Sequence, residues 1–239
     1  MNASPSSERA RGIGRRGLLL GGLATAATAA LSVAKPGAAF ADETVGGVAF
    51  QTGYHNGYFY SFYTDIPGST TMYLKDGGEY AVSWNSTGNS VVGKGWDRGS
   101  WRTVNYEGYY APSTGGSFLT LYGWSANPLI EYYVIDNWGG DWAGWRPAPG
   151  VWRGTVDANG GTYDIYQDTR YDAPSVEGTK TFDQFFSVRQ SPRTGGSITT
   201  NDHFTAWANL GMNLGSLDYY MIVAAEGING SGNADIHVS

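Results

Sequence analysis

Apolar and polar residues alternate along many short segments of this chain, and turn residues separate one segment from the next. Alternation with a period of two is typical of a β-strand that buries one face. The segments that show it are "NGYFYSFYTD", "GEYAVSWN", "SFLTLYGWSA", "LIEYYVIDNW", "VWRGTVDANGGTYDIYQDTRY", "TKTFDQFFSVRQS" and "DYYMIVAAEG". Asn159-Gly160 supplies residues that tolerate the positive φ angles of a hairpin turn. The pattern predicts an antiparallel β protein.

One segment, "TTNDHFTAWANLGM", has helical spacing instead. Thr200 or Asn201 is expected to cap this helix and Gly211 to end it. Its apolar stripe would consist of Phe204, Trp207 and Ala208. No internal repeat and no Pro/Ser-rich linker is present. Many strands with a single helix predict two packed sheets, a β-jelly-roll sandwich.

Two of the predicted strands contain a glutamate among apolar residues. Glu131 lies within "PLIEYYVID", and Glu226 ends the strand in "DYYMIVAAEG". The alternation places Glu131 on one face with Leu129, Tyr133 and Ile135, and Glu226 on one face with Tyr220, Ile222 and Ala224. A buried charge is costly, so such a glutamate is either at an exposed position or a working group. Glycoside hydrolysis uses two carboxyls, but the pattern alone does not bring these two together.

The composition is rich in aromatic residues and poor in charged ones. The chain has 17 Tyr, 9 Trp and 9 Phe, which make 15% of its residues, and charged residues also make 15%, well below the usual quarter. An aromatic β core would explain part of this excess. Tyr and Trp in a polar, Gly-rich chain also suit a long groove in which flat rings stack on sugar faces.

The first 41 residues predict an export signal rather than part of the fold. A basic start precedes an apolar stretch at residues 17–33, and Ala39-Phe40-Ala41 matches the A-x-A cleavage pattern. Arg15-Arg16 resembles a twin-arginine signal, although the Ser or Thr that usually precedes the pair is missing, so the ordinary secretory route is an alternative. A membrane anchor is disfavoured by the short, weakly apolar stretch. We expect cleavage after Ala41 and a bacterial, secreted, extracellular protein.

The mature chain, residues 42–239, has the length of one domain and is acidic. Five of the 15 Lys and Arg residues and one of the 21 Asp and Glu residues lie in residues 1–41, so residues 42–239 carry a net charge of −10. This charge argues against nucleic acid binding. The chain has no Cys, and its three His residues are scattered without an HExxH motif. We therefore expect no metal and no cofactor, and we expect His203 to be a buried, hydrogen-bonded structural residue.

Longer motifs carry a resemblance to a known family. "VVGKGW", "PLIEYYVID", "GGTYDIYQDTRYDAPSVEGT", "FSVRQSPRTGGSIT", "HFTAWANLGMNLG" and "AAEG" occur in this order. With these motifs the chain closely resembles glycoside hydrolase family 11, the small β-jelly-roll endo-β-1,4-xylanases. The resemblance runs from about Tyr54 to the C-terminus. It implies hydrolysis of internal β-1,4 bonds of xylan by a protein that we expect to be a monomer without membrane attachment in its mature form.

The resemblance also implies residue roles. Glu131 would be the nucleophile and Glu226 the general acid/base of a retaining double displacement. The former would need a depressed pKa and the latter a raised one. The residues assigned to substrate binding are Tyr63, Tyr122, Tyr133, Arg170, Pro174, Gln184 and Tyr220, and residues 172–178 would form a thumb loop over the cleft. Asn89 matches the residue that hydrogen-bonds the acid/base, and an asparagine there is typical of members active at neutral or alkaline pH.

Three features depart from the family's usual pattern, and they concern substrate affinity rather than the reaction. Tyr63 replaces a Trp that stacks on the sugar one unit beyond the cleavage site, and Ile228 replaces a common aromatic residue. Residues 137–147 form a longer link that contains Trp142 and Trp145. A non-catalytic carbohydrate-binding module on the same sandwich is the main alternative function, and a sandwich of the related cellulase clan is a lesser one.

Overall fold

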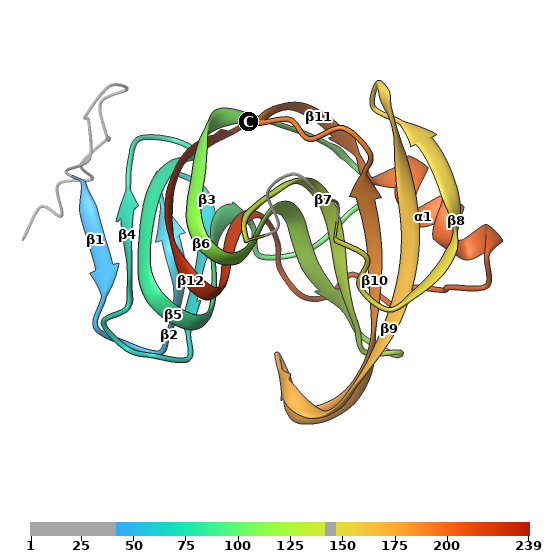
Figure 1. Cartoon of the computed structure of the whole chain (residues 1–239), viewed down its shortest axis with the longest axis horizontal. Helices are drawn as coiled ribbons and strands as arrows, with labels where there is room; N and C mark the ends of the chain where they lie inside the picture. Colours follow the sequence, from blue (N-terminus) through green and yellow to red (C-terminus); the bar gives the residue numbers. More distant parts are fainter. Residues whose placement is uncertain (1–41, 142–146) are drawn as a thin grey trace, which may run out of the picture. The chain divides into compact units, whose positions relative to one another are not determined.

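The computed structural model describes residues 42–141 and 147–239. The predicted export segment, residues 1–41, lies outside the described residues, as do Trp142 and Trp145. The elements are β1 (Glu43–Gly46), β2 (Phe50–His55), β3 (Tyr58–Thr64), β4 (Thr70–Leu74), β5 (Glu79–Trp96), β6 (Thr103–Ser125), β7 (Ile130–Gly140), β8 (Val151–Ala158), β9 (Gly161–Ser175), β10 (Gly178–Arg189), β11 (Gly195–Thr199), α1 (Thr200–Asn209) and β12 (Met221–Val238) (Figure 1).

Three long strands, β5, β6 and β12, run through both layers of the fold. Residues 80–84 of β5 pair with β4 and with the end of β12, whereas residues 90–95 pair with β3 and with the start of β12. The pairing is therefore continuous, in the order β1-β4-β5-β12-β6-β7-β10-β9-β8, while β2 and β3 extend one layer and β11 pairs with β6 (Figure 1). A sheet that folds onto itself in this way is the predicted β-jelly-roll.

Strand β12 has an irregularity at a point of close backbone contact. The pairing of β12 with β5 changes register between Gly230 and Gly232. A Cβ atom on Gly230 would collide with the Thr114 carbonyl of β6. A residue without a side chain is required there because the backbones of two strands touch.

One strand pair differs from the purely antiparallel arrangement that the sequence predicts. Among the described strands, β7 and β10 pair in parallel, with Asp183 opposite Ile130 and Val188 opposite Ile135. The intervening β8 and β9 lie beyond β10, so β7 and β10 are not joined by a hairpin. Apolar alternation fixes which face a residue occupies, but it does not encode the direction of the partner strand.

The two faces of β7 contribute to two different apolar clusters. Ile130, Tyr132 and Val134 belong to the core between the layers. Tyr133 and Ile135 belong to a second cluster on the other face, together with Ile222 and Ala224 of β12. The period of two predicted for both strands is confirmed, and it places Glu131 and Glu226 on the face of the second cluster.

The predicted helix is confirmed as α1, but its N-cap and its buried face differ from the prediction. Its N-cap is Thr199 rather than the predicted Thr200 or Asn201, with extended backbone and no side-chain cap hydrogen bond. The Thr200 hydroxyl is engaged with the backbone of Arg102, the residue before β6. Phe204 and Trp207 are buried as predicted. Ala208 is exposed, so it does not belong to the buried face of the helix, contrary to the prediction. Gly211 follows the helix at φ +77°, and its N–H donates to the carbonyl of Ala208 at 3.0 Å, as expected of a terminating glycine.

The predicted hairpin turn is also confirmed. Ala158 pairs with Gly161, and Asn159 and Gly160 between them have φ values of 51° and 72°. The Asn159 side chain then reaches the helix: its Oδ1 accepts a hydrogen bond from the Thr199 N–H at 3.2 Å and lies 3.2 Å from His203 Nε2. His203 is fully buried, and burial lowers its pKa to about 3, which keeps it neutral. Its expected structural character is confirmed.

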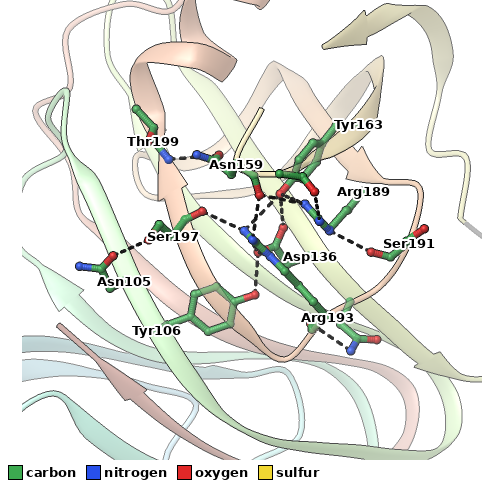
Figure 2. Close-up of polar contacts among 12 residues, drawn as sticks. Asn105, Tyr106, Asp136, Asn159, Tyr163, Arg189, Ser191, Arg193, Ser197 and Thr199 are labelled. Atoms are coloured by element: carbon green, nitrogen blue, oxygen red, sulfur yellow. Dashed lines mark hydrogen bonds and ion pairs between the residues drawn. The ribbon is translucent and has the colours of Figure 1, made fainter. Parts of the chain in front are cut away.

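A buried polar network is centred on Asp136 of β7 (Figure 2). Asp136 Oδ2 accepts hydrogen bonds from Tyr106 (2.6 Å) and Arg193 Nε (2.8 Å), and Oδ1 accepts one from Tyr163 (2.6 Å). Arg193 also donates to the Ser197 carbonyl at 2.9 Å. The network links β6, β7, β9 and β11, so it fixes strands that are remote in sequence.

None of the described helices is long and apolar enough to cross a membrane.

Candidate active site

Glu131 lies on β7 with both carboxylate oxygens hydrogen-bonded. Oε1 accepts the Tyr122 hydroxyl of β6 at 2.6 Å, and Oε2 accepts the Gln184 amide of β10 at 2.6 Å. The cross-strand register creates this contact, because Gln184 stands directly opposite Glu131. Trp124 Nε1 in turn donates to the Tyr122 hydroxyl at 2.8 Å. Side chains from the two strands that flank β7 therefore orient this carboxyl group.

The pKa of Glu131 differs from the depressed value that the resemblance implies. Burial raises it, while hydrogen bonds from Tyr122, Gln184 and Tyr133 and the positive charge of Arg170 lower it. The balance is a pKa above the usual value of a glutamate. The donors favour the ionised form but do not fully offset the loss of hydration.

Glu226 lies on β12 and is less well satisfied. Its Oε1 accepts the Asn89 amide at 2.9 Å, whereas its buried Oε2 has no hydrogen-bond partner among the described residues. Burial, followed by the negative charge of Glu131, raises the pKa of Glu226 to about 8, and Asn89 and Arg170 oppose this rise. Glu226 is therefore protonated at neutral pH and has a free oxygen from which it can donate.

A chain of contacts positions Asn89 on β5. The Asn89 N–H donates to Asp65 Oδ1 at 2.8 Å, and the Asp65 N–H donates to the Asn89 carbonyl at 3.0 Å. A Cβ atom on Gly88 would displace the Asp65 carboxylate from its present position. Asp65 thus fixes the backbone of the residue that contacts Glu226. The sequence analysis missed Asp65, because only the β3–β5 pairing brings it to Asn89.

Aromatic rings line the face between the two glutamates. The ring of Tyr122 lies 5.0 Å from that of Tyr133 and 6.0 Å from that of Tyr220. Tyr133 stacks on Phe186 at 4.8 Å, and Tyr220 stacks on Phe59 at 5.7 Å. Tyr63 of β3 is half-buried and packs against the same cluster. The predicted tyrosines are therefore together on one face, and Trp124, Phe59 and Phe186 join them although the sequence analysis did not select them.

The predicted thumb, residues 172–178, forms the end of the β9–β10 hairpin. Pro174 is exposed there and stands opposite Thr179. At its tip, Glu177 Oε1 accepts a hydrogen bond at 2.8 Å from the hydroxyl of Tyr219, the neighbour of Tyr220. The tip thus lies beside the segment that leads into β12. Arg170, at the base of this hairpin, is exposed, and its charge lowers the pKa of both glutamates.

No group of three or more His, Asp or Glu residues that could hold a metal ion occurs within residues 42–141 and 147–239. The chemistry of the site is that of two carboxyls in unlike surroundings. Glu131 accepts hydrogen bonds from three donors, and Glu226 retains a proton at neutral pH. Two carboxyls with different surroundings, on an aromatic-lined sheet of a jelly-roll, match what the glycosidase class of protein uses.

Comparison with known proteins gives the family. Residues 55–237 match the glycosyl hydrolases family 11, and the chain belongs to this family. It is 50% identical over 190 residues to the probable endo-1,4-beta-xylanase B of Aspergillus clavatus, covering 79% of this chain and 83% of that protein. It is 47% identical over 186 residues to endo-1,4-beta-xylanase A of Gibberella zeae, covering 78% of each chain. The family predicted from the sequence motifs is confirmed.

Proposed function

We propose that this protein is an endo-1,4-β-xylanase that works by a retaining double displacement, with Glu131 as nucleophile and Glu226 as general acid/base. The observation that carries the proposal is the unlike setting of the two buried glutamates. Donors surround both oxygens of Glu131, whereas Glu226 has a pKa of about 8 and one oxygen without a partner among the described residues. The names of the relatives as endo-1,4-beta-xylanases support xylan as the substrate.

In the first step, Glu226 donates its proton to the glycosidic oxygen while an oxygen of Glu131 forms a bond to the anomeric carbon. The bond between that carbon and the leaving oxygen breaks, and a covalent glycosyl-enzyme results. The hydrogen bonds from Tyr122 and Gln184 orient Glu131 for this attack. The free Oε2 of Glu226 is the atom available for proton transfer.

In the second step, Glu226, now ionised, removes a proton from water, and the water oxygen attacks the anomeric carbon. The bond to Glu131 breaks, and both glutamates return to their starting protonation states. Two displacements at one carbon retain the β configuration. The Asn89 amide contacts Glu226 Oε1 and leaves Oε2 for the proton, which is the geometry that both steps need.

Reducing-sugar release from xylan and from carboxymethyl-cellulose tests the activity. We expect release from xylan only, whereas a protein that binds xylan without releasing sugar would be a carbohydrate-binding module. Proton NMR of the first products tests the mechanism. A β-anomeric product is expected, and a first product with α configuration would exclude retention.

We also propose that the mature protein is secreted and monomeric. The A-x-A pattern at Ala39-Phe40-Ala41 supports export, and the acidic chain from residue 42 onward supports solubility. N-terminal sequencing of the exported protein should give a start at Asp42, and light scattering should give the mass of one chain. An intact N-terminus in the culture medium, or a dimer mass, would reject the corresponding part of this proposal.

A further inference from the structure

The edge strand β2 exposes two aromatic side chains on the face that carries the candidate site. Phe50 is 59% exposed and Tyr54 is 64% exposed. The opposite face of β2 turns inward, since Gln51 Nε2 donates to the hydroxyl of the core residue Tyr60 at 2.8 Å. Alternation along the strand therefore directs Phe50 and Tyr54 to the other side, and Tyr54 does contact Phe59 there.

Phe50 continues a row of side chains that starts at Glu226. In the cross-strand register, Glu226 of β12 stands opposite Val91 of β5, Val91 opposite Tyr63 of β3, and Tyr63 opposite Phe50 of β2. Residues that stand opposite each other share a face, so all four belong to the face of the site. Phe50 is the last member of the row, at the open edge of the sheet.

The spacing of this row suits a polysaccharide. Neighbouring strands lie about 4.7–4.9 Å apart, which is similar to the length that one ring adds to an extended β-1,4-linked sugar chain. A chain that crosses the strands therefore meets about one new strand for each sugar. Since Tyr63 is a candidate stacking residue for one sugar, the next sugar outward reaches β2 and Phe50.

The chemistry of Phe50 also fits a sugar better than a protein partner. Single exposed aromatic residues are common on protein surfaces, but this one extends a face already lined by tyrosines. A flat ring without a polar group stacks on the C–H-bearing face of a sugar and needs no hydrogen bond. Tyr63 has a smaller ring system than Trp, so a second ring beside it enlarges the flat surface.

We infer that Phe50 forms a further binding position for a β-1,4-linked xylosyl unit, one sugar beyond the position at Tyr63, at the open edge of the cleft. The inference rests on the proposed function and extends it: the protein should discriminate in favour of chains long enough to reach β2. Phe50 contacts substrate far from the reacting bond, so it contributes to affinity for long chains rather than to the chemical step.

The test compares chain lengths. Values of kcat/KM are measured on xylotriose and xylohexaose for the wild type, Phe50→Ala, Phe50→Leu, Phe50→Trp and Tyr73→Ala. Tyr73 is a matched control, because it is an exposed aromatic residue on β4, outside both apolar clusters. Phe50→Ala should lower the ratio of kcat/KM on xylohexaose to that on xylotriose about fivefold, the low end of what stacking on an aromatic ring contributes.

The other variants separate stacking from folding. Phe50→Leu keeps an apolar side chain but no flat face, so it should resemble Phe50→Ala, whereas Phe50→Trp should keep or raise the ratio. Tyr73→Ala should keep it. A Phe50→Ala ratio equal to that of the wild type, or an equal fall in Tyr73→Ala, would overturn the inference. A wild type without activity on xylan would instead overturn the proposed function.

A binding measurement is independent of turnover. In Glu131→Gln protein, the Kd of xylohexaose is measured by calorimetry with and without Phe50→Ala. A weakening of about fivefold for xylohexaose supports the position at Phe50. An equal Kd of xylohexaose in the two proteins would overturn it.

Discussion

The protein buries carboxylates in two regions, and these regions differ in how completely the oxygens are hydrogen-bonded. Asp136 is fully buried, and two tyrosines and Arg193 satisfy its two oxygens (Figure 2). Glu226 is almost as buried, yet its Oε2 has no partner within the described part of the chain. Both lie on long strands of one sheet, so strand structure alone does not explain the difference.

The comparison shows that burial of a carboxyl group has different consequences in the two regions. A buried carboxylate with complete hydrogen bonds and an adjacent guanidinium remains stable and locks its neighbours in place. A buried carboxyl that lacks a partner is costly in free energy, and the cost is reduced when it takes up a proton. In the proposed function, a substrate oxygen would become the missing partner of Glu226 Oε2. On that proposal, the first region stabilises the fold and the second serves the reaction.

The largest expected effect comes from replacing either glutamate of the candidate active site. Glu226→Gln should lower kcat on xylan by about 10²–10⁴-fold, the usual contribution of a general acid/base, and Glu131→Gln by at least as much. Below pH 4.5, where both glutamates are mostly protonated in the folded and the unfolded protein, melting temperatures should stay close to that of the wild type. On aryl xylosides with good leaving groups, glycosylation should suffer less in Glu226→Gln than in Glu131→Gln, because such groups need little protonation. Hydrolysis of xylan at the wild-type rate in either variant would contradict the assignment.

The next largest effect comes from disrupting the hydrogen-bond network around Asp136. Asp136→Asn leaves Arg193 partly buried without its counter-charge, so the free energy of unfolding should fall by about 3–5 kcal/mol. Denaturant titration measures this loss. Activity per folded molecule at low temperature should remain within a fewfold of the wild type. Asp218→Asn is a suitable control, since its ion pair with Arg98 is exposed and should contribute little. Equal stability losses in both variants would reject the contrast.

A third test compares stability against pH. The pKa of Glu226 is raised to about 8 in the folded protein, so its contribution to stability is fully present below the pKa of an unfolded glutamate, 4.5. That contribution is lost as pH rises through about 8. Glu226→Gln has no such group, and its stability relative to the wild type should therefore increase between pH 4.5 and 8 and then level off. A difference that does not change with pH would contradict an abnormal pKa.

A smaller effect concerns the partner of Glu226. Asn89→Asp places a second carboxyl beside Glu226, and the two would share a proton, so the active form would be populated at lower pH. The profile of kcat/KM should move by about one unit toward acid, the scale of an ordinary environmental shift. The alkaline limb of the wild type should reflect loss of the Glu226 proton near its pKa of about 8. Superimposable profiles of the two proteins would reject a pH-tuning role for Asn89.

The smallest effect concerns Asp65, which acts on Glu226 through Asn89. Asp65→Ala removes one hydrogen bond, so kcat/KM should fall by up to about tenfold, the weight of a typical hydrogen bond. The alkaline limb should move as Asn89 loosens, in the same experiment that is used for Asn89→Asp. Asp65→Asn keeps an acceptor oxygen and should restore both quantities. A loss in Asp65→Ala without any movement of the alkaline limb would indicate a merely structural role.

Local patterns in the sequence predicted much of the fold. The alternation in "LIEYYVIDNW" placed Glu131 and Tyr133 on one face, and Asn159-Gly160 marked the hairpin turn. The helix was predicted within one or two residues at its start, where the cap proved to be Thr199. These features depend on residues that are neighbours in the chain, so spacing and turn chemistry are sufficient to reveal them.

The sequence by itself thus determined which residues form strands, which side chains share a face, and through motifs the family. The motifs also implied the contact of Asn89 with Glu226 across 137 positions, and the structure confirms it. Only the tertiary structure decided the other partners: Gln184 with Glu131 across 53 positions, and Asp65 with Asn89 across 24. It also decided the parallel pairing of β7 with β10 and the setting of Asp136. The physical reason is that strand register and the bending of long strands arise from the whole sheet, whereas periodicity is a property of a few adjacent residues.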